Sequence, residues 1–285
     1  MRRRTVQGML LLAVLAAGLI GLGGGYILWG WPANWYAARD VFKLPATPEN
    51  QLIQYGWQLV TETPRLIGKS ASDPSLRYAG NDLACTQCHL KAGNKAFAAP
   101  FVSTFASFPM MVNDEVLTLT DRINGCMTRS MNGQPLPESS REMEALLAYM
   151  RFIGEGSPEG VRVTGMGLFP VAPAPEPPDR ARGEKVYAHS CASCHGANGQ
   201  GQRNSAPQVG FLVPPLWGDD SFNSAAGMSR LTTAAAFIRA NMPYRTTEAH
   251  NPSLGVQEAW DVAAYVTSQP RPAGPADRAA SLTSN

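Results

Sequence analysis

Two short stretches, "CTQCH" (residues 85–89) and "CASCH" (residues 191–195), decide how this chain folds. Both have the form C-x-x-C-H, the attachment signature of c-type haem. Two cysteines one helical turn apart can reach the two vinyl groups of one porphyrin, and the adjacent histidine then meets the iron. A zinc site would pair two such boxes within one domain, and a thioredoxin-like site would need a βαβ context. We therefore expect two covalently bound c-type haems, one held by Cys85, Cys88 and His89 and the other by Cys191, Cys194 and His195.

The sequence around the two boxes follows one plan twice. An amphipathic helical segment precedes each box, at residues 49–63 and 179–190. A second helical segment follows at 114–127 and 231–244, and a third closes each half at 140–154 and 255–269. Apolar residues at helical spacing give each closing segment one buried face: Met143, Leu146, Leu147 and Met150 in one, and Trp260, Val262, Ala263 and Val266 in the other. With no convincing run of strands, the predicted fold is all-α, with two haem domains in tandem.

A proline-rich stretch, "FPVAPAPEPPD" (residues 169–179), interrupts the periodic segments. Such a run favours extended polyproline geometry and is typical of an interdomain connector. We therefore predict a first domain at residues 40–168, a linker at 169–178 and a second domain at 179–270. The polar, Ala/Pro/Ser-rich residues 271–285 are expected to form a flexible tail.

Residues 1–31 have the pattern of a membrane anchor. Three arginines are followed by an uncharged, apolar run at residues 8–31, long enough to cross a bilayer as a helix, with aromatic residues near its end. We expect an uncleaved helix that anchors the haem domains on the periplasmic side of the inner membrane. The alternative is a cleaved signal segment and a soluble periplasmic protein. The net charge of +2, with no dense Lys/Arg stripe, gives no reason to expect a nucleic-acid partner.

The second haem has a methionine candidate for its sixth ligand. In "IRANMPYR", Met242 follows a predicted helix, precedes a proline and lies 47 residues after His195. A Met–His haem has a raised potential that suits outward electron transfer. Met228 and His250 are the alternatives, whereas His189 lies on the helix that enters the box and is badly placed for the distal face.

The first haem has several candidates. When the two halves are superposed in sequence, Met127 matches Met242, and Met131 lies close behind. Cys126 is in the same region, and a thiolate binds ferric haem iron and lowers its potential. An unpaired cysteine in an oxidising compartment needs a reason. The neighbouring Arg122 and Arg129 would lower its thiol pKa if they pointed inward.

Both halves resemble the cytochrome c family, whose domains are usually three-helix shells around one haem. The stretch "RINGCMTRSMNGQPLP" (residues 122–137), with the pattern R-x-x-x-C-x-x-R-S-x-N-G, resembles the thiosulfate dehydrogenase family and, more distantly, the SoxA proteins. The resemblance implies that Cys126 is the distal ligand of the His89 haem and that Arg122 binds anions, with Arg129 also in the motif. Some members carry a lysine where this chain has Asn241, so any ligand exchange by that lysine does not carry over.

The family reaction joins two thiosulfate ions into tetrathionate and releases two electrons. By this resemblance, electrons would pass from the His/Cys haem to the His/Met haem and on to an external acceptor such as a small cytochrome c. Arginines suit the two dianions because their guanidinium groups are planar and permanently charged. The reverse reaction stays open, as do two other functions: a membrane-anchored dihaem electron carrier without its own substrate, and a SoxA-like subunit.

Overall fold

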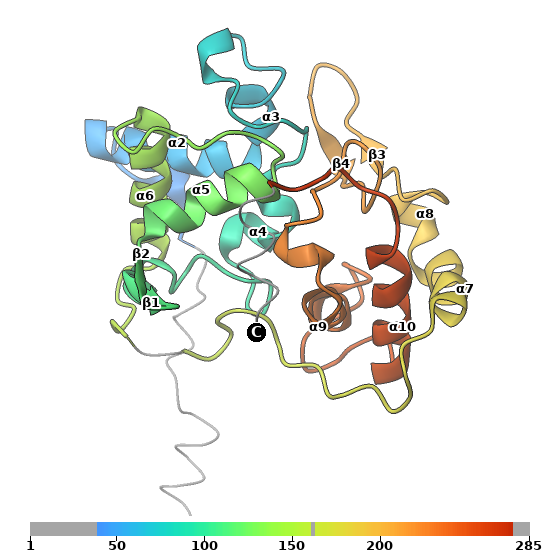
Figure 1. Cartoon of the computed structure of the whole chain (residues 1–285). Coiled ribbons are helices and arrows are strands. Elements are labelled where there is room, and N and C mark those ends of the chain that lie inside the picture. Colours follow the sequence, from blue (N-terminus) through green and yellow to red (C-terminus); the bar gives the residue numbers. More distant parts are fainter. Residues whose placement is uncertain (1–38, 161–162, 276–285) are drawn as a thin grey trace, which may run out of the picture. The chain divides into compact units, whose positions relative to one another are not determined.

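Helices account for most of the regular structure in residues 39–160 and 163–275, the part of the chain that the computed structural model describes (Figure 1). The α-helices are α2 (Pro48–Thr61), α3 (Thr63–Leu66), α4 (Leu90–Gly93), α5 (Leu119–Arg129), α6 (Arg141–Ile153), α7 (Arg180–Ser190), α8 (Ala192–His195), α9 (Leu231–Asn241) and α10 (Val256–Thr267). Short 3₁₀ turns lie at Val41–Lys43, Pro74–Leu76, Cys85–Gln87, Phe105–Ser107 and Gly227–Ser229. No helix in these ranges is long and apolar enough to span a membrane. The predicted anchor at residues 1–31 lies outside them.

In the first half of the chain, residues 39–168, α2 crosses α6 at very short range. A Cβ atom on Gly56 would lie only 2.0 Å from the main-chain oxygen of Ala145, so only glycine permits this crossing. The ends of the helices are set locally: the hydroxyl of Thr47 accepts a hydrogen bond from the Asn50 amide, and that of Ser140 from the Met143 amide. These two helices match the predicted first and third segments of this half.

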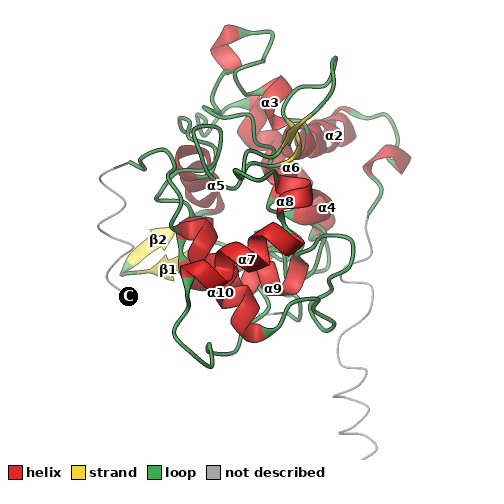
Figure 2. Cartoon of the chain, turned by 90° about the vertical axis from the view of Figure 1, so that its right-hand side faces the viewer, coloured by secondary structure: helices red, strands yellow, loops and turns green. Residues whose placement is uncertain are grey.

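The second half, residues 179–270, repeats this crossing with α7 and α10, which lie side by side in both views (Figures 1 and 2). Here a Cβ atom on Gly183 would lie 2.0 Å from the main-chain oxygen of Asp261. The Asp179 carboxylate accepts a hydrogen bond from the Arg182 amide and so caps α7. The same close crossing of first and last helix in both halves agrees with the twofold plan in the sequence.

The described residues also contain two small antiparallel sheets, which the all-α prediction missed. Strand β1 (Met110–Val112) pairs with β2 (Glu115–Leu117), and β3 (Gln202–Arg203) pairs with β4 (Phe211–Val213). Asn113 and Asp114 both have positive φ, which makes the tight turn of the first hairpin. The helix predicted at 114–127 therefore begins only at Leu119, where Thr118 and Asp121 form a capping box.

One hydrophobic core includes side chains from both halves. Phe211, Phe222 and Ala226 are buried in the same cluster as Leu59, Met127, Leu146 and other residues of the first half. These three residues lie in the long connection between α8 and α9. The second half therefore contributes to the apolar surroundings of the first haem box, besides building its own.

Candidate functional site

The first haem box lies between α2 and α4, and its histidine is held in one orientation. The His89 Nδ1 atom is 2.6 Å from the carbonyl oxygen of Ala99, so the ring donates a hydrogen bond there and leaves Nε2 for a metal. The Phe101 ring packs beside it, 4.3 Å between centroids. Thr63, fully buried, accepts a hydrogen bond of 3.2 Å from the Cys85 amide. These contacts orient His89 and Cys85 within the box.

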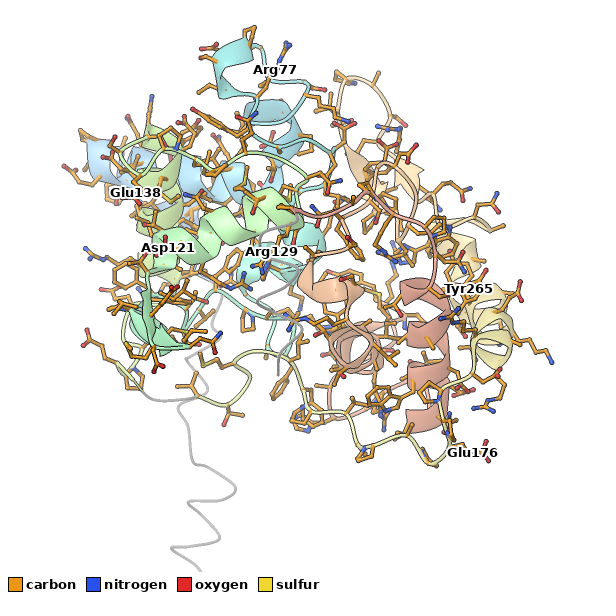
Figure 3. All side chains as sticks on the ribbon, in the orientation of Figure 1. Arg77, Asp121, Arg129, Glu138, Glu176 and Tyr265 are labelled. Atoms are coloured by element: carbon orange, nitrogen blue, oxygen red, sulfur yellow. The ribbon has the colours of Figure 1, made fainter. Side chains whose placement is uncertain are left out.

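Helix α5 presents a sulfur and a cation to the same place. Arg122 and Cys126 stand one turn apart, and the Arg122 guanidinium donates to the Cys126 sulfur at 3.1 Å. Cys126 lies in the last turn of α5, within the helical segment predicted at residues 114–127. Asp121 and Arg129 mark the first and last turns of α5 (Figure 3), where their charges complement the helix dipole.

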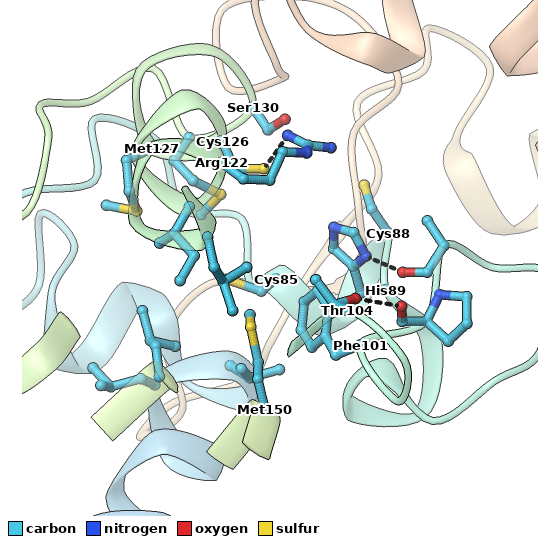
Figure 4. A pocket seen from close by; sticks show the side chains of 18 of the residues that line it. Cys85, Cys88, His89, Phe101, Thr104, Arg122, Cys126, Met127, Ser130 and Met150 are labelled. Atoms are coloured by element: carbon cyan, nitrogen blue, oxygen red, sulfur yellow. Dashed lines mark hydrogen bonds between the residues drawn. The ribbon is translucent and has the colours of Figure 1, made fainter. Parts of the chain in front are cut away.

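A cavity of about 330 Å³ separates the haem box from α5 (Figure 4). Cys85, Cys88 and His89 line one part of it, and Arg122 and Cys126 line another. The rest of the wall is mainly apolar and includes Leu59, Phe101, Leu146 and Met150. Two attachment thiols, an oriented imidazole and an apolar wall are what a c-type haem requires, so the residues fit the first predicted haem.

The surroundings of Cys126 favour its thiolate. Burial is the largest single influence and raises the pKa of this thiol. The charge of Arg122, the hydrogen bond and charge of His89, and the charge of Arg129 together outweigh burial and lower the pKa to about 6. The thiolate is the form of cysteine that binds metals, so the lowered pKa agrees with the predicted role of Cys126 as an iron ligand beside His89.

Three further residues of the motif have distinct places. Arg129 donates from Nε to the Gly125 carbonyl at 2.7 Å and acts on Cys126 through its charge; it is not among the described residues that line the cavity. Met127 and Met131, the alternative ligands, are both buried and both line the cavity. All three candidate sulfur ligands therefore line the cavity. Of the three, Cys126 is the one whose sulfur accepts a hydrogen bond from Arg122.

The second haem box is built in a similar way. The His195 Nδ1 atom lies 2.9 Å from the Pro214 carbonyl oxygen and donates to it, as His89 does to Ala99. Burial lowers the pKa of His195, and the hydrogen bond to Pro214 partly opposes this. The Tyr187 hydroxyl donates to the Gly196 carbonyl at 2.6 Å, and its ring packs against Trp217. An imidazole that is already oriented beside two cysteines fits the second predicted haem.

Met242 directly follows α9, as the sequence predicted. Its side chain is half-buried and packs against the cluster of Leu90, Ala98 and Phe237. Ile238, one turn earlier on α9, packs against the cluster that includes Cys191. Met242 as the ligand of the His195 haem therefore stays a prediction.

The other candidates are placed more clearly. Met228, an alternative ligand for the second haem, instead lines the cavity at the first haem box. His189 is exposed on α7, in agreement with its exclusion as a ligand. His250 packs edge-on against the rings of Phe97 and Phe169. Sequence reasoning missed Met228 and Thr63 as parts of the first site, because no motif joins them to a box so distant along the chain.

Two family models match the chain. A model described as the SoxA/TsdA cytochrome c domain matches residues 77–158, and a cytochrome c model matches residues 180–270. These are the two regions that carry the boxes, so the expected pair of cytochrome c domains with two covalent haems is confirmed.

The chain is similar in sequence to several proteins named thiosulfate dehydrogenase. The chain is 39% identical over 235 residues to that of Stutzerimonas stutzeri, covering 81% of this chain and 71% of the relative. It is equally identical to the one from Thiomonas intermedia, with 81% and 70% covered. Among solved structures, it is similar to a thiosulfate dehydrogenase (TsdBA) from Marichromatium purpuratum, with a TM-score of 0.73 and 36% identity. That match covers 84% of this chain and 50% of the solved chain.

Proposed function

The chain belongs to the thiosulfate dehydrogenase family, and from this premise we propose that it oxidises two thiosulfate ions to one tetrathionate ion. Each thiosulfate loses one electron as a sulfur–sulfur bond forms between the two terminal sulfurs, so two electrons leave per product. The observation that carries the proposal is the pair formed by Arg122 and Cys126, 3.1 Å apart on the wall of the first haem cavity. A plain electron carrier would have no use for such a pair.

The roles of the residues follow from their chemistry. Two dianions must approach each other against their repulsion, and the Arg122 charge at the cavity reduces this cost for the first to bind. Arg129 adds a second positive charge near the same sulfur. Cys126 and His89 line the same cavity and would together hold the iron of the first haem, and the Cys126 sulfur would be available there to the terminal sulfur of the substrate. When bound, the haem supplies a one-electron acceptor beside the reacting sulfur.

Cys191, Cys194 and His195 would hold the second haem, with Met242 as the proposed fourth protein group, and this haem would supply an acceptor for the electrons from the first site. A haem with histidine and methionine ligands has a higher potential than one with histidine and thiolate ligands, so this ligand set would favour electron transfer from the first site to the second. We take the final acceptor to be an external carrier such as a small cytochrome c. We also place the haem domains on the periplasmic side of the inner membrane, attached by residues 1–31. The apolar run at residues 8–31 and the two attachment boxes support this placement.

The test uses the purified dihaem protein with thiosulfate and ferricyanide, with tetrathionate as the measured product. Wild type should form tetrathionate and Cys126→Gly should lose at least most of this activity, because the variant has neither the ligand nor the sulfur. Thr128→Ala is the matched control. Thr128 lies on the same helix, its hydroxyl donates a hydrogen bond to the Asn124 carbonyl, and it is not among the described residues that line the cavity. The opposite result would be that thiosulfate does not reduce the haems of the wild type and that both haems show the absorption band of a methionine ligand. That result would identify the chain as an electron carrier.

A further inference from the structure

The second variable residue of the first haem box, Gln87, joins the two halves of the chain. Its side-chain oxygen accepts a hydrogen bond of 3.0 Å from the Ala84 amide, within its own box. Its side-chain nitrogen donates a hydrogen bond of 2.6 Å to the Phe211 carbonyl, at the start of β4 in the second half. Both ends of the amide are therefore engaged. In the second box, the corresponding residue is Ser193, whose hydroxyl is too short for such a reach.

The strand that Gln87 binds is anchored to the first half at two more points. The Phe211 ring is buried in the core that surrounds the first haem box. Arg203, on the neighbouring strand β3, donates a hydrogen bond of 3.0 Å to the Asp82 carboxylate, just before the first box. The Arg203 guanidinium also lies 4.5 Å from the centroid of the Phe211 ring. The first half therefore holds β4 in three ways: through the Phe211 carbonyl, through the buried Phe211 ring and through Arg203 on the neighbouring strand.

The same strand ends at the second haem box. Val213, the last residue of β4, is followed by Pro214, whose carbonyl accepts the hydrogen bond from His195 at 2.9 Å. Two hydrogen bonds, to carbonyl groups that are three residues apart on the chain, therefore connect Gln87 to the histidine of the second haem box. This path between the two haem boxes is short, and most of it runs along β4, whose backbone is paired with β3.

We propose that Gln87 is a positioning residue for the second haem: by holding β4, it keeps the Pro214 carbonyl on His195 and thereby sets the potential of that haem. A histidine that donates to a carbonyl is a more basic iron ligand, and this stabilises the ferric state. Weakening the hydrogen bond raises the potential. The inference rests on a haem bound at His195 and not on the proposed substrate.

The experiment is a redox titration of the holoprotein, followed in the visible spectrum and fitted with one component for each haem. The methionine–iron absorption band identifies the His/Met component. The test variant is Gln87→Met, which keeps the length of the side chain and loses both hydrogen bonds. Gln87→Asn, a smaller change that keeps an amide but is too short to reach Phe211, covers the case in which the first variant does not fold. Gln51→Met, at an exposed position of α2, is the matched control.

In the Gln87 variants we expect the ferric–ferrous equilibrium of the His/Met haem to shift about tenfold toward the ferrous form, or ~59 mV upward for one electron. The control should match the wild type. An unchanged His/Met component in a folded, fully loaded Gln87 variant would overturn the inference, and so would a shift confined to the other haem. The titration contains no thiosulfate, so its result is independent of whether the chain oxidises thiosulfate.

Discussion

Replacement of Arg122 by glutamine directly tests its proposed role in binding the thiosulfate anion. The change removes one permanent charge and the donor that stands 3.1 Å from the Cys126 sulfur, but keeps a polar side chain of similar reach. A hydrogen bond to a charged group is worth roughly 1.5–3 kcal/mol. Because Arg122 is exposed, solvent screens its charge, and the lower part of that range, about 1.5–2 kcal/mol, applies. This corresponds to a loss of about 10- to 30-fold in kcat/KM.

The assay measures initial rates of thiosulfate oxidation with ferricyanide at several ionic strengths. Wild-type kcat/KM should fall as salt is added, since salt screens the attraction between Arg122 and the substrate, and the variant should respond less steeply. Arg122→Lys should recover only part of the rate, because lysine keeps the charge but not the fork of donors. Arg180→Gln, at an exposed position on α7, is the control. Equal kcat/KM and equal salt dependence in Arg122→Gln and wild type would refute the assignment of Arg122 to substrate binding.

Two further predictions concern stability. Gly183→Ala should lower the free energy of unfolding by about 1–3 kcal/mol, since the added Cβ would lie 2.0 Å from main chain of α10; chemical denaturation beside exposed Lys185→Ala checks this, and equal midpoints would contradict it. The Asp261 carboxylate is desolvated, which raises its pKa, but hydrogen bonds from Arg182, the Asp179 amide and Gln257 hold that pKa below its usual value. Its contribution is therefore complete above the unfolded pKa near 4 and disappears as pH falls through the folded value. Asp261→Asn should lower the free energy of unfolding by about 1–3 kcal/mol at pH 7, and the difference from wild type should shrink below about pH 4; a difference independent of pH would show that Asp261 does not act as a carboxylate.

Local sequence predicted the helices well where their own residues set the ends. The periodic segments at 49–63 and 140–154 became α2 and α6, and the capping residues Thr47 and Ser140 stand at their starts. The segment at 114–127 was predicted less well, because its first residues pair with a neighbouring strand. A short apolar stretch fits a strand or a helix equally, and the partner decides between them.

The candidate site divides in the same manner. The haem boxes could be found from sequence because the attachment chemistry needs five consecutive residues and nothing else. Cys126 could be singled out from sequence because it is the one cysteine outside the two boxes and because it lies in the motif at residues 122–137. Its contact with Arg122 follows from a spacing of one helical turn, which sequence also supplies.

The sequence by itself thus determined the two haem attachment boxes, most of the helices around them and the motif in which Arg122 and Cys126 lie. Only the tertiary structure decided that Cys126 meets His89, that Met228 belongs to the first cavity and that β4 joins the two haem boxes. The physical reason is the separation of the contacting residues along the sequence. Spacing along the chain fixes which residues share a face or a turn, whereas the neighbours that fill the other side are chosen by close packing between segments far apart in sequence.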